Sequence, residues 1–218
     1  MKSDAWGLVL SFVYVFGILF AAEGLRKWRG YPIDFTRKFV HIGVGMWVVG
    51  TVLLFESRYI AVIPPLSFVA LNYISYRRSV FQAMETGERE NLGTVYFPIS
   101  FALLILWLWP RPELLVAALM PMTWGDALAA IAGGRWGRHK HPFAGSMKSW
   151  EGSLTMFLAS WLAVSLALLV FSSLGWWAML GGALIVALAA TVAEAITPWH
   201  LDNLTVPLIS AAALTLLL

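Results

Sequence analysis

The feature that most limits how this chain can fold is a series of uncharged apolar stretches, each long enough to cross a lipid bilayer. No charged residue occurs between Glu151 and Glu194, and this stretch alone is long enough for two spans. A span needs roughly 17–25 apolar residues, because about 30 Å of hydrocarbon is crossed at about 1.5 Å per residue. Only 12% of the residues are charged, whereas soluble domains usually carry about 25%. The sequence therefore predicts an all-α, polytopic membrane protein.

Seven or eight transmembrane helices are predicted. They leave no contiguous segment for a separate soluble domain, so residues 1–218 are expected to form one transmembrane domain. The first stretch is expected to be a retained span and not a cleaved signal peptide. Pro64-Pro65 is expected to kink or interrupt the third helix, because proline lacks an amide donor. The predicted spans are Ala5–Ala22, Phe39–Phe55, Tyr59–Tyr76, Thr94–Trp109, Leu114–Gly133, Leu154–Phe171, Trp176–Ile196 and Leu204–Leu218.

Basic residues are divided unevenly between the two sides of this topology. With eight spans, one side carries only Lys2, Arg58 and Arg111, and the other carries all the remaining lysines and arginines. By the positive-inside rule the basic side is cytoplasmic, which leaves both termini outside. The chain has no cysteine, so thiolate metal sites and cysteine nucleophiles are excluded. The basic side holds Arg26, Lys27, Arg29, Arg37, Lys38, Arg77, Arg78, Arg89, Arg135, Arg138, Lys140 and Lys148.

Unusual polar residues gather on the same basic side. Asp126 lies inside the fifth predicted span, where an isolated carboxylate costs about 2.5–3.5 kcal/mol on insertion scales. Glu194 occupies the corresponding end of the seventh span, and Asp202 and Asn203 follow at the entry to the last. Such carboxylates are expected to face a polar cavity, a cation or a partner. The alternative is pairing with arginine or lysine that only fixes the packing of helices.

The segment after Asp126 is rich in small residues and leads into a basic loop at 134–152. Gly133, Gly134 and Gly137 leave room for a ligand's phosphates or for a neighbouring helix, and both interpretations stay open. Lys148 and Ser149 precede the next span, where helix amides and an ammonium group can hold phosphate oxygens. Glu151 is expected to orient Lys148 or to contribute to a magnesium site. A basic loop of this kind also serves as an orientation signal or contacts lipid headgroups.

A second basic cluster opens the second predicted span. His41 lies about one turn into that span, on the side of Arg37 and Lys38. These residues are candidates for the mouth of a site on the basic side. The alternative is a pair of snorkelling cations beside a hydrogen-bonded core histidine.

Four blocks of the chain together resemble the polyprenol kinase family, which includes phytol, farnesol and dolichol kinases. The segment GDALAAIAGGRWGRHKHPFAGSMKSWEGS (residues 125–153) resembles the family signature D-x-x-A-x-x-x-G-x-x-x-G…K-[ST]-x-E-G. RKFVHIG (37–43), GTVYFP (93–98) and EAITPWHLDNLTVP (194–207) resemble three further blocks in the same order. The last block is more similar to the phytol and farnesol kinase branch than to dolichol kinases. The residues matching the signature are Asp126, Ala129, Gly133, Gly137, Lys148, Ser149, Glu151 and Gly152.

The resemblance implies a lipid kinase that uses CTP. Its reaction would transfer the γ-phosphoryl group of CTP to a membrane-dissolved isoprenoid alcohol (phytol, geranylgeraniol, farnesol or a polyprenol), giving the monophosphate and CDP. The resemblance carries over Asp126, Lys148, Ser149, Glu151 and Gly152 as nucleotide- and metal-site residues. It carries over Glu194, Asp202 and Asn203 as active-site residues.

Roles for these residues follow as hypotheses. Asp126, with Glu194 or Asp202, is expected to hold Mg²⁺ against the triphosphate, and Lys148 to neutralise the transferring group. Asp202 is expected to accept the proton of the alcohol. The residues expected in catalysis are Asp126, Lys148, Asp202, Glu194 and His41. Those expected to bind the nucleotide are Gly133, Gly134, Gly137, Lys148, Ser149, Glu151, Gly152, Asn203, Arg37 and Lys38.

Two other functions compete with this one. A cytidylyltransferase resembling CDP-diacylglycerol synthase has a similar nucleotide motif, but its C-terminal signature is basic and rich in glycine. The block Glu194–Pro207 has no lysine, arginine or glycine. A non-enzymatic transporter or scaffold would place polar residues on both faces or at the midplane. The expected partners are a nucleoside triphosphate, an isoprenoid alcohol and the bilayer, with no nucleic acid, and an oligomer stays open because Gly133-x-x-x-Gly137 is also a helix-packing spacing.

Overall fold

The structure is a computed structural model that describes residues 3–78, 92–143, 146–198 and 201–218. Arg89 of the basic side lies outside the described residues. Contacts divide the chain into two compact units, residues 1–107 and 108–218, which are described separately. The prediction that 1–218 form a single domain stays a prediction.

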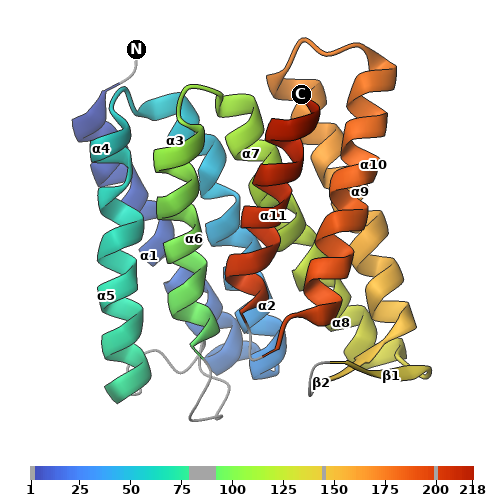
Figure 1. Cartoon of the computed structure of the whole chain (residues 1–218). Helices are drawn as coiled ribbons and strands as arrows, with labels where there is room; N and C mark the ends of the chain where they lie inside the picture. Colours follow the sequence, from blue (N-terminus) through green and yellow to red (C-terminus); the bar gives the residue numbers. More distant parts are fainter. Residues whose placement is uncertain (1–2, 79–91, 144–145, 199–200) are drawn as a thin grey trace. The chain divides into compact units, whose positions relative to one another are not determined.

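The first unit consists of helices packed mainly on α1 (Asp4–Arg29). The others are α2 (Ile33–Gly45), α3 (Trp47–Leu54), α4 (Arg58–Ala61), α5 (Ile63–Arg78) and α6 (Gly93–Leu108) (Figure 1). Helix α1 ends at Gly30, whose φ of 66° is the left-handed conformation that glycine adopts without strain.

Polar contacts reinforce the apolar packing of this unit. Its buried core contains Val15, Leu19, Ala22, Val40 and Phe68. The hydroxyl of Tyr14 donates to the carbonyl of Gly43 at 2.9 Å, and Trp47 Nε1 donates to Ser11 Oγ at 2.9 Å. Asn72 Nδ2 donates to the carbonyl of Thr94 at 2.7 Å, which joins α5 to α6.

The second unit is built around one long helical segment that changes type along its length. It begins as α7 (Pro112–Met120), continues as a π-helical segment η1 (Pro121–Asp126) and ends as α8 (Ala127–Trp136). Residues 114–120 are apolar on every face and all are buried, so α7 is the core helix of this unit. Helices α9 (Trp150–Phe171) and α11 (Asp202–Leu217) pack on it, and α10 (Trp176–Ile196) packs on α9 and α11 (Figure 1).

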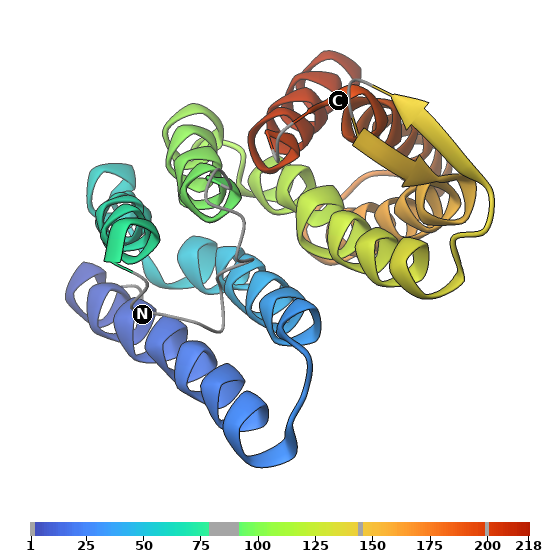
Figure 2. The same cartoon turned by 90° about the horizontal axis from the view of Figure 1, so that it is seen from below.

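A small antiparallel hairpin joins α8 to α9. Its strands are β1 (Lys140–Phe143) and β2 (Ser146–Ser149), with Lys140 paired to Ser149 and His141 to Lys148. Figure 2 shows the hairpin at the end of the unit where α8 ends and α9 begins. The sequence predicted only a loop here, so the hairpin is an addition to the all-α fold.

Hydropathy identified the membrane-spanning helices correctly. Within the described residues, six helical segments are long and apolar enough to cross a bilayer, and two shorter apolar helices, Gly93–Leu108 and Asp202–Leu217, accompany them. The protein is therefore an all-α polytopic membrane protein, as predicted. The third span is interrupted at Val62, two residues before Pro64-Pro65, as expected. The six longer segments are Asp4–Arg29, Ile33–Leu54, Arg58–Arg77, Pro112–Trp136, Trp150–Phe171 and Trp176–Ile196.

Candidate active site

Three carboxylates converge at one end of the second unit. Asp126, Glu194 and Asp202 each offer one oxygen, and these oxygens lie within 4.8 Å of one another. The residues are distant in sequence and come from η1, α10 and α11. We call these three residues the acidic cluster. Their side chains are largely withdrawn from solvent, with exposed fractions of 10% for Glu194 and 14% for Asp202.

Lys148 contacts the acidic cluster from the hairpin. Its ammonium donates to the side-chain Oε1 and to the backbone carbonyl of Glu194, and it lies 3.8 Å from Asp202 Oδ2. Its own side chain is 18% exposed. Like charges brought this close repel one another, and an ammonium group among them lowers that cost. The structure thus brings together four of the five residues that the sequence analysis expected in catalysis, and the fifth, His41, belongs to the first unit.

The junction between α10 and α11 holds two of the carboxylates side by side. Glu194 lies in the last turn of α10, and Asp202 is the first residue of α11. The hydroxyls of Thr197 and Thr205 are 2.9 Å apart and join the two helix ends. The first turn of a helix also favours an anionic side chain, because its amide groups carry partial positive charge. The sequence had given no role to these two threonines.

Asp126 is placed by the π-helical segment. Asp126 is the last residue of η1, and π-helical turns often occur at functional sites. The segment packs closely on α9, where a Cβ on Gly125 would lie 2.2 Å from Ser160 Oγ and 2.7 Å from Met156 Sδ. The 10 residues of α8 then extend about 15 Å beyond Asp126 at about 1.5 Å per residue. The helix is longer than the predicted span, which ended at Gly133.

The three glycines of the signature surround Ser149. The side chain of Ser149 caps α9 by accepting from the amide of Gly152 at 3.2 Å. A Cβ on Gly133 or Gly152 would lie 3.1 Å from Ser149 Oγ, and one on Gly137 would lie 2.6 Å from it. These glycines therefore let α8 approach the start of α9. Gly134 is different, because a Cβ at that position would meet no atom within 4 Å.

Glu151 contacts the base of the hairpin. Its Oε1 accepts from the backbone amides of Arg138 at 3.2 Å and His139 at 3.3 Å, and lies 2.7 Å from His139 Nδ1. The sequence gave His139 no partner, because nothing in the basic run indicates which residue faces the first turn of α9. The predicted roles of Ser149, Glu151 and the glycines in nucleotide binding stay predictions.

The remaining predicted residues belong to α2 and α11. Arg37, Lys38 and His41 belong to α2 of the first unit, where the ring of His41 meets Phe97 edge-on at 4.5 Å. Their place at the mouth of the site stays a prediction. Asn203 lies beside Asp202 in the first turn of α11, and its amide donates to Asp202 Oδ1 at 3.0 Å.

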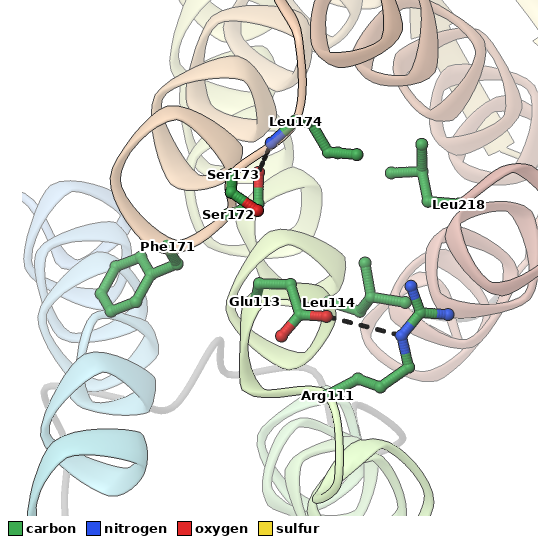
Figure 3. Close-up of a pocket in the computed structure, with 8 residues that line it drawn as sticks. All are labelled: Arg111, Glu113, Leu114, Phe171, Ser172, Ser173, Leu174 and Leu218. Carbon is green, nitrogen blue, oxygen red and sulfur yellow. Dashed lines mark hydrogen bonds and ion pairs between the residues drawn. The ribbon is translucent and has the colours of Figure 1, made fainter.

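A separate hollow of about 330 Å³ lies at the opposite end of the second unit (Figure 3). Arg111 Nε and Glu113 Oε1 are 3.4 Å apart at its edge, so the two side chains form an ion pair. Asp126 lies more than three helical turns from Glu113 along the same helical segment. The hollow is therefore separate from the acidic cluster, and no residue of the cluster lines it. It is lined by Arg111, Glu113, Leu114, Phe171, Ser172, Ser173, Leu174 and Leu218.

The acidic cluster has the chemistry of a magnesium site. Mg²⁺ prefers oxygen ligands and is commonly held by one or two carboxylates together with substrate phosphates. The cluster supplies three carboxylates and already holds a cation, the ammonium of Lys148. The residues present therefore fit a divalent cation.

These features define a polytopic α-helical membrane protein with an acidic site at the ends of its helices, and its relatives identify it further. The chain is 35% identical over 204 residues to phytol kinase of Synechocystis sp., covering 93% of this chain and 87% of that protein. It is 34% identical to probable phytol kinase 1, chloroplastic, of Oryza sativa subsp. japonica, covering 93% of this chain and 70% of that protein. It is 29% identical to farnesol kinase, chloroplastic, of Arabidopsis thaliana, covering 94% and 75%. No family model matches the chain, and no solved structure matches it significantly.

The chain belongs to the polyprenol kinase family.

Proposed function

We propose that this protein transfers the γ-phosphoryl group of CTP to the hydroxyl group of an isoprenoid alcohol dissolved in the bilayer. The observation that carries the proposal is the convergence of Asp126, Glu194, Asp202 and Lys148 in a chain whose relatives are named phytol and farnesol kinases. The products of this transfer would be the prenyl monophosphate and CDP. CTP as the donor rests on the family resemblance alone.

The four residues suit the charges of this reaction. Asp126 and Glu194, with Asp202 beside them, would hold Mg²⁺, which when bound neutralises charge on the triphosphate. Lys148 is a point charge that can leave Glu194 for a phosphoryl oxygen as negative charge develops there. The new bond joins the alcohol oxygen to the γ-phosphorus, and the bond from that phosphorus to the β,γ-bridging oxygen breaks.

Asp202 is our choice for the proton acceptor. Its carboxylate lies 3.8 Å from the Lys148 ammonium, whereas that of Glu194 is in direct contact with it. The less tightly paired carboxylate is the more available base. The alcohol proton would pass to Asp202 as the oxygen attacks phosphorus.

A site at the cytoplasmic ends of the spans would be accessible to both the alcohol and the nucleotide. The isoprenoid tail partitions into the bilayer and leaves its hydroxyl at the interface, while the nucleotide arrives from water. The excess of basic residues on this side of the predicted topology supports a cytoplasmic location.

The test is a transfer assay with purified protein and CTP labelled at either phosphorus. A kinase moves the γ-label to phytol, geranylgeraniol, farnesol or dolichol, and the α-label stays in solution. Transfer of the α-label would instead establish a cytidylyltransferase, and no transfer with any nucleotide would leave a transporter or scaffold. Parallel reactions with ATP, GTP and UTP establish the donor.

Asp126→Asn is the variant that tests the metal assignment. It keeps the size of the side chain but removes a charge from the acidic cluster, so turnover should fall by about 10²- to 10³-fold, the scale of a lost electrostatic group. Circular dichroism and thermal unfolding should match the unsubstituted protein. Full activity in this variant would remove the metal site from the proposal.

A further inference from the structure

The hairpin that carries Lys148 is too small to hold its own position. Each strand has 4 residues, and an isolated two-stranded hairpin is at best marginally stable in water. Lys148 lies in β2, opposite His141. The position of its ammonium therefore depends on what holds the base of the hairpin against the helices.

Glu151 provides that attachment from the first turn of α9. Both of its oxygens face the segment that leads into β1: Oε1 accepts from the amides of Arg138 and His139, and Oε2 lies 3.4 Å from the amide of His139. His139 Nδ1 completes the contact at 2.7 Å. A backbone hydrogen bond joins the same two segments, with the amide of Trp150 donating to the carbonyl of His139 at 3.1 Å.

These contacts close a short ring of chain around Lys148. The ring runs from Glu151 to Arg138 and His139, through β1 and β2, and back to α9. Lys148 is three residues from Glu151, so a shift of the hairpin base moves its ammonium relative to Glu194 and Asp202. Among the described residues, the carboxylates that converge on a common point are those of the acidic cluster, and Glu151 is not one of them.

We infer that Glu151 and His139 are positioning residues that act through Lys148 and bind neither the metal nor the nucleotide. The inference rests on the proposed function, in which Lys148 neutralises the transferring group. It gives the glutamate of the family signature a different role from the one that the resemblance implies.

The first experiment is a double-mutant cycle that combines substitutions of Glu151 and Lys148 and measures kcat. Glu151→Gln keeps one acceptor oxygen but loses the negative charge and one of the two acceptors, so kcat should fall about 10- to 100-fold, the loss typical when a residue supporting a catalytic ligand is removed. KM for the nucleotide and the alcohol should stay within about twofold, since no substrate contact is lost. In a Lys148→Met background the same change should cost less than about twofold, because residues that act as a unit are not additive.

The second experiment needs no turnover. Acylation of lysines by a small anhydride, followed by peptide mass spectrometry, measures how well each ammonium is protected. Lys148 should become several times more reactive in Glu151→Gln, while the exposed Lys140 of the same hairpin serves as the internal reference. Mn²⁺ affinity, measured by electron paramagnetic resonance, should not fall in Glu151→Gln, because Glu151 is not one of the three converging carboxylates, and should fall in Asp126→Asn.

Variants of His139 distinguish a loss of Lys148 positioning from a general loss of folding. Asparagine can place an amide donor near the position of His139 Nδ1, so His139→Asn should retain most of the activity and the protection of Lys148. His139→Leu cannot donate and should reproduce part of the Glu151→Gln defect. The side chain of His139 is 79% exposed, so neither change should unfold the protein.

Glu113→Gln is the matched control. Glu113 is a carboxylate of the same unit with a similar exposed fraction, 25% against 30% for Glu151, and it also contacts a basic side chain. It lies at the opposite end of the unit, and its substitution should leave all these measurements unchanged.

The inference is overturned if Glu151→Gln weakens Mn²⁺ or nucleotide binding as Asp126→Asn does, or if Lys148 keeps its protection. Failure of the unsubstituted protein to phosphorylate any alcohol would reject the proposed function instead. The acylation measurement would still report whether Glu151 holds Lys148 in place.

Discussion

Lys148 partly neutralises the negative charge of the acidic cluster. Three carboxylates whose oxygens lie within 4.8 Å of one another carry three negative charges when all are ionised. The ammonium of Lys148 contacts Glu194 and approaches Asp202, so it offsets one of them. It occupies space at the same oxygens that a divalent cation would use. We therefore expect Lys148 and a divalent cation to compete for the acidic cluster in the absence of nucleotide.

Replacing this lysine should strengthen binding of a free divalent cation. Lys148→Met removes the competing charge but keeps the aliphatic length, so Mn²⁺ affinity without nucleotide should rise by about tenfold or more, equivalent to about 1.4 kcal/mol. Turnover should fall in the same variant. Electron paramagnetic resonance gives the affinity directly.

Lys140→Met is the control for this measurement. Lys140 belongs to the same hairpin but is exposed, and its ammonium donates to the carbonyl of Gly133 at 3.4 Å. Its removal should leave Mn²⁺ affinity unchanged. Weaker Mn²⁺ binding in Lys148→Met would show that the lysine supports the metal site and does not compete with the ion.

At the scale of elements, α8 and the start of α9 approach each other closely. Ser149 lies between the two helices, and Gly133, Gly137 and Gly152 leave space for it. The sequence left two interpretations of these glycines open, phosphate binding and helix packing. The close approach to Ser149 supplies a physical reason for the packing interpretation.

A pair of alanine substitutions tests this contact. A Cβ on Gly137 would lie 2.2 Å from the carbonyl oxygen of Gly133 and 2.8 Å from Ser149 Cβ, so Gly137→Ala should destabilise the protein by about 1–3 kcal/mol, the usual cost of overpacking. Gly134→Ala meets nothing within 4 Å and should stabilise α8 by up to about 1 kcal/mol through helix propensity. Thermal unfolding in detergent measures both. Equal stability of the two variants would rule out the packing role.

The helices were easier to predict than the elements between them. Length and hydropathy are local properties, so Trp176–Ile196 was predicted with its observed bounds and most other spans to within a few residues. The β1–β2 hairpin was missed because its stability depends on contacts of Glu151 and Ser149 that no local pattern records. The π-helical form of η1 was missed for the same reason, since it is fixed by packing against α9.

At the scale of the whole molecule, the excess of basic residues on one side predicts the orientation in the membrane. The absence of cysteine makes the protein a ready background for single-cysteine labelling. Cysteines at Lys140 and Arg29, both exposed, should react with a membrane-impermeant maleimide only from the cytoplasmic side. Cysteines at Ser57 and Ser173 should react only from the opposite side.

Right-side-out and inverted vesicles allow both sides to be labelled separately. Each position outside the site should also retain transfer activity, which confirms that the labelled protein is native. Labelling of Lys140→Cys and Ser173→Cys from the same side would contradict the eight-span topology, because α9 lies between them.

The composition of the candidate site was predicted only in part from the residues alone. Asp126, Glu194 and Asp202 stood out because hydrocarbon disfavours isolated carboxylates. That they meet at one point depends on how α10 and α11 pack against η1, which sequence spacing does not specify. The family resemblance supplied the connection to Lys148, and the structure brings the four residues together.

One consequence concerns how members of this family can be recombined. The three carboxylates and the lysine all belong to the part of the chain after Trp107. A hybrid that joins the corresponding first half of the Arabidopsis thaliana farnesol kinase to residues 108–218 of this chain would inherit this whole group from a single parent. Any altered choice of alcohol in such a hybrid would then come from the other parent, which makes this boundary a practical crossover point for family shuffling.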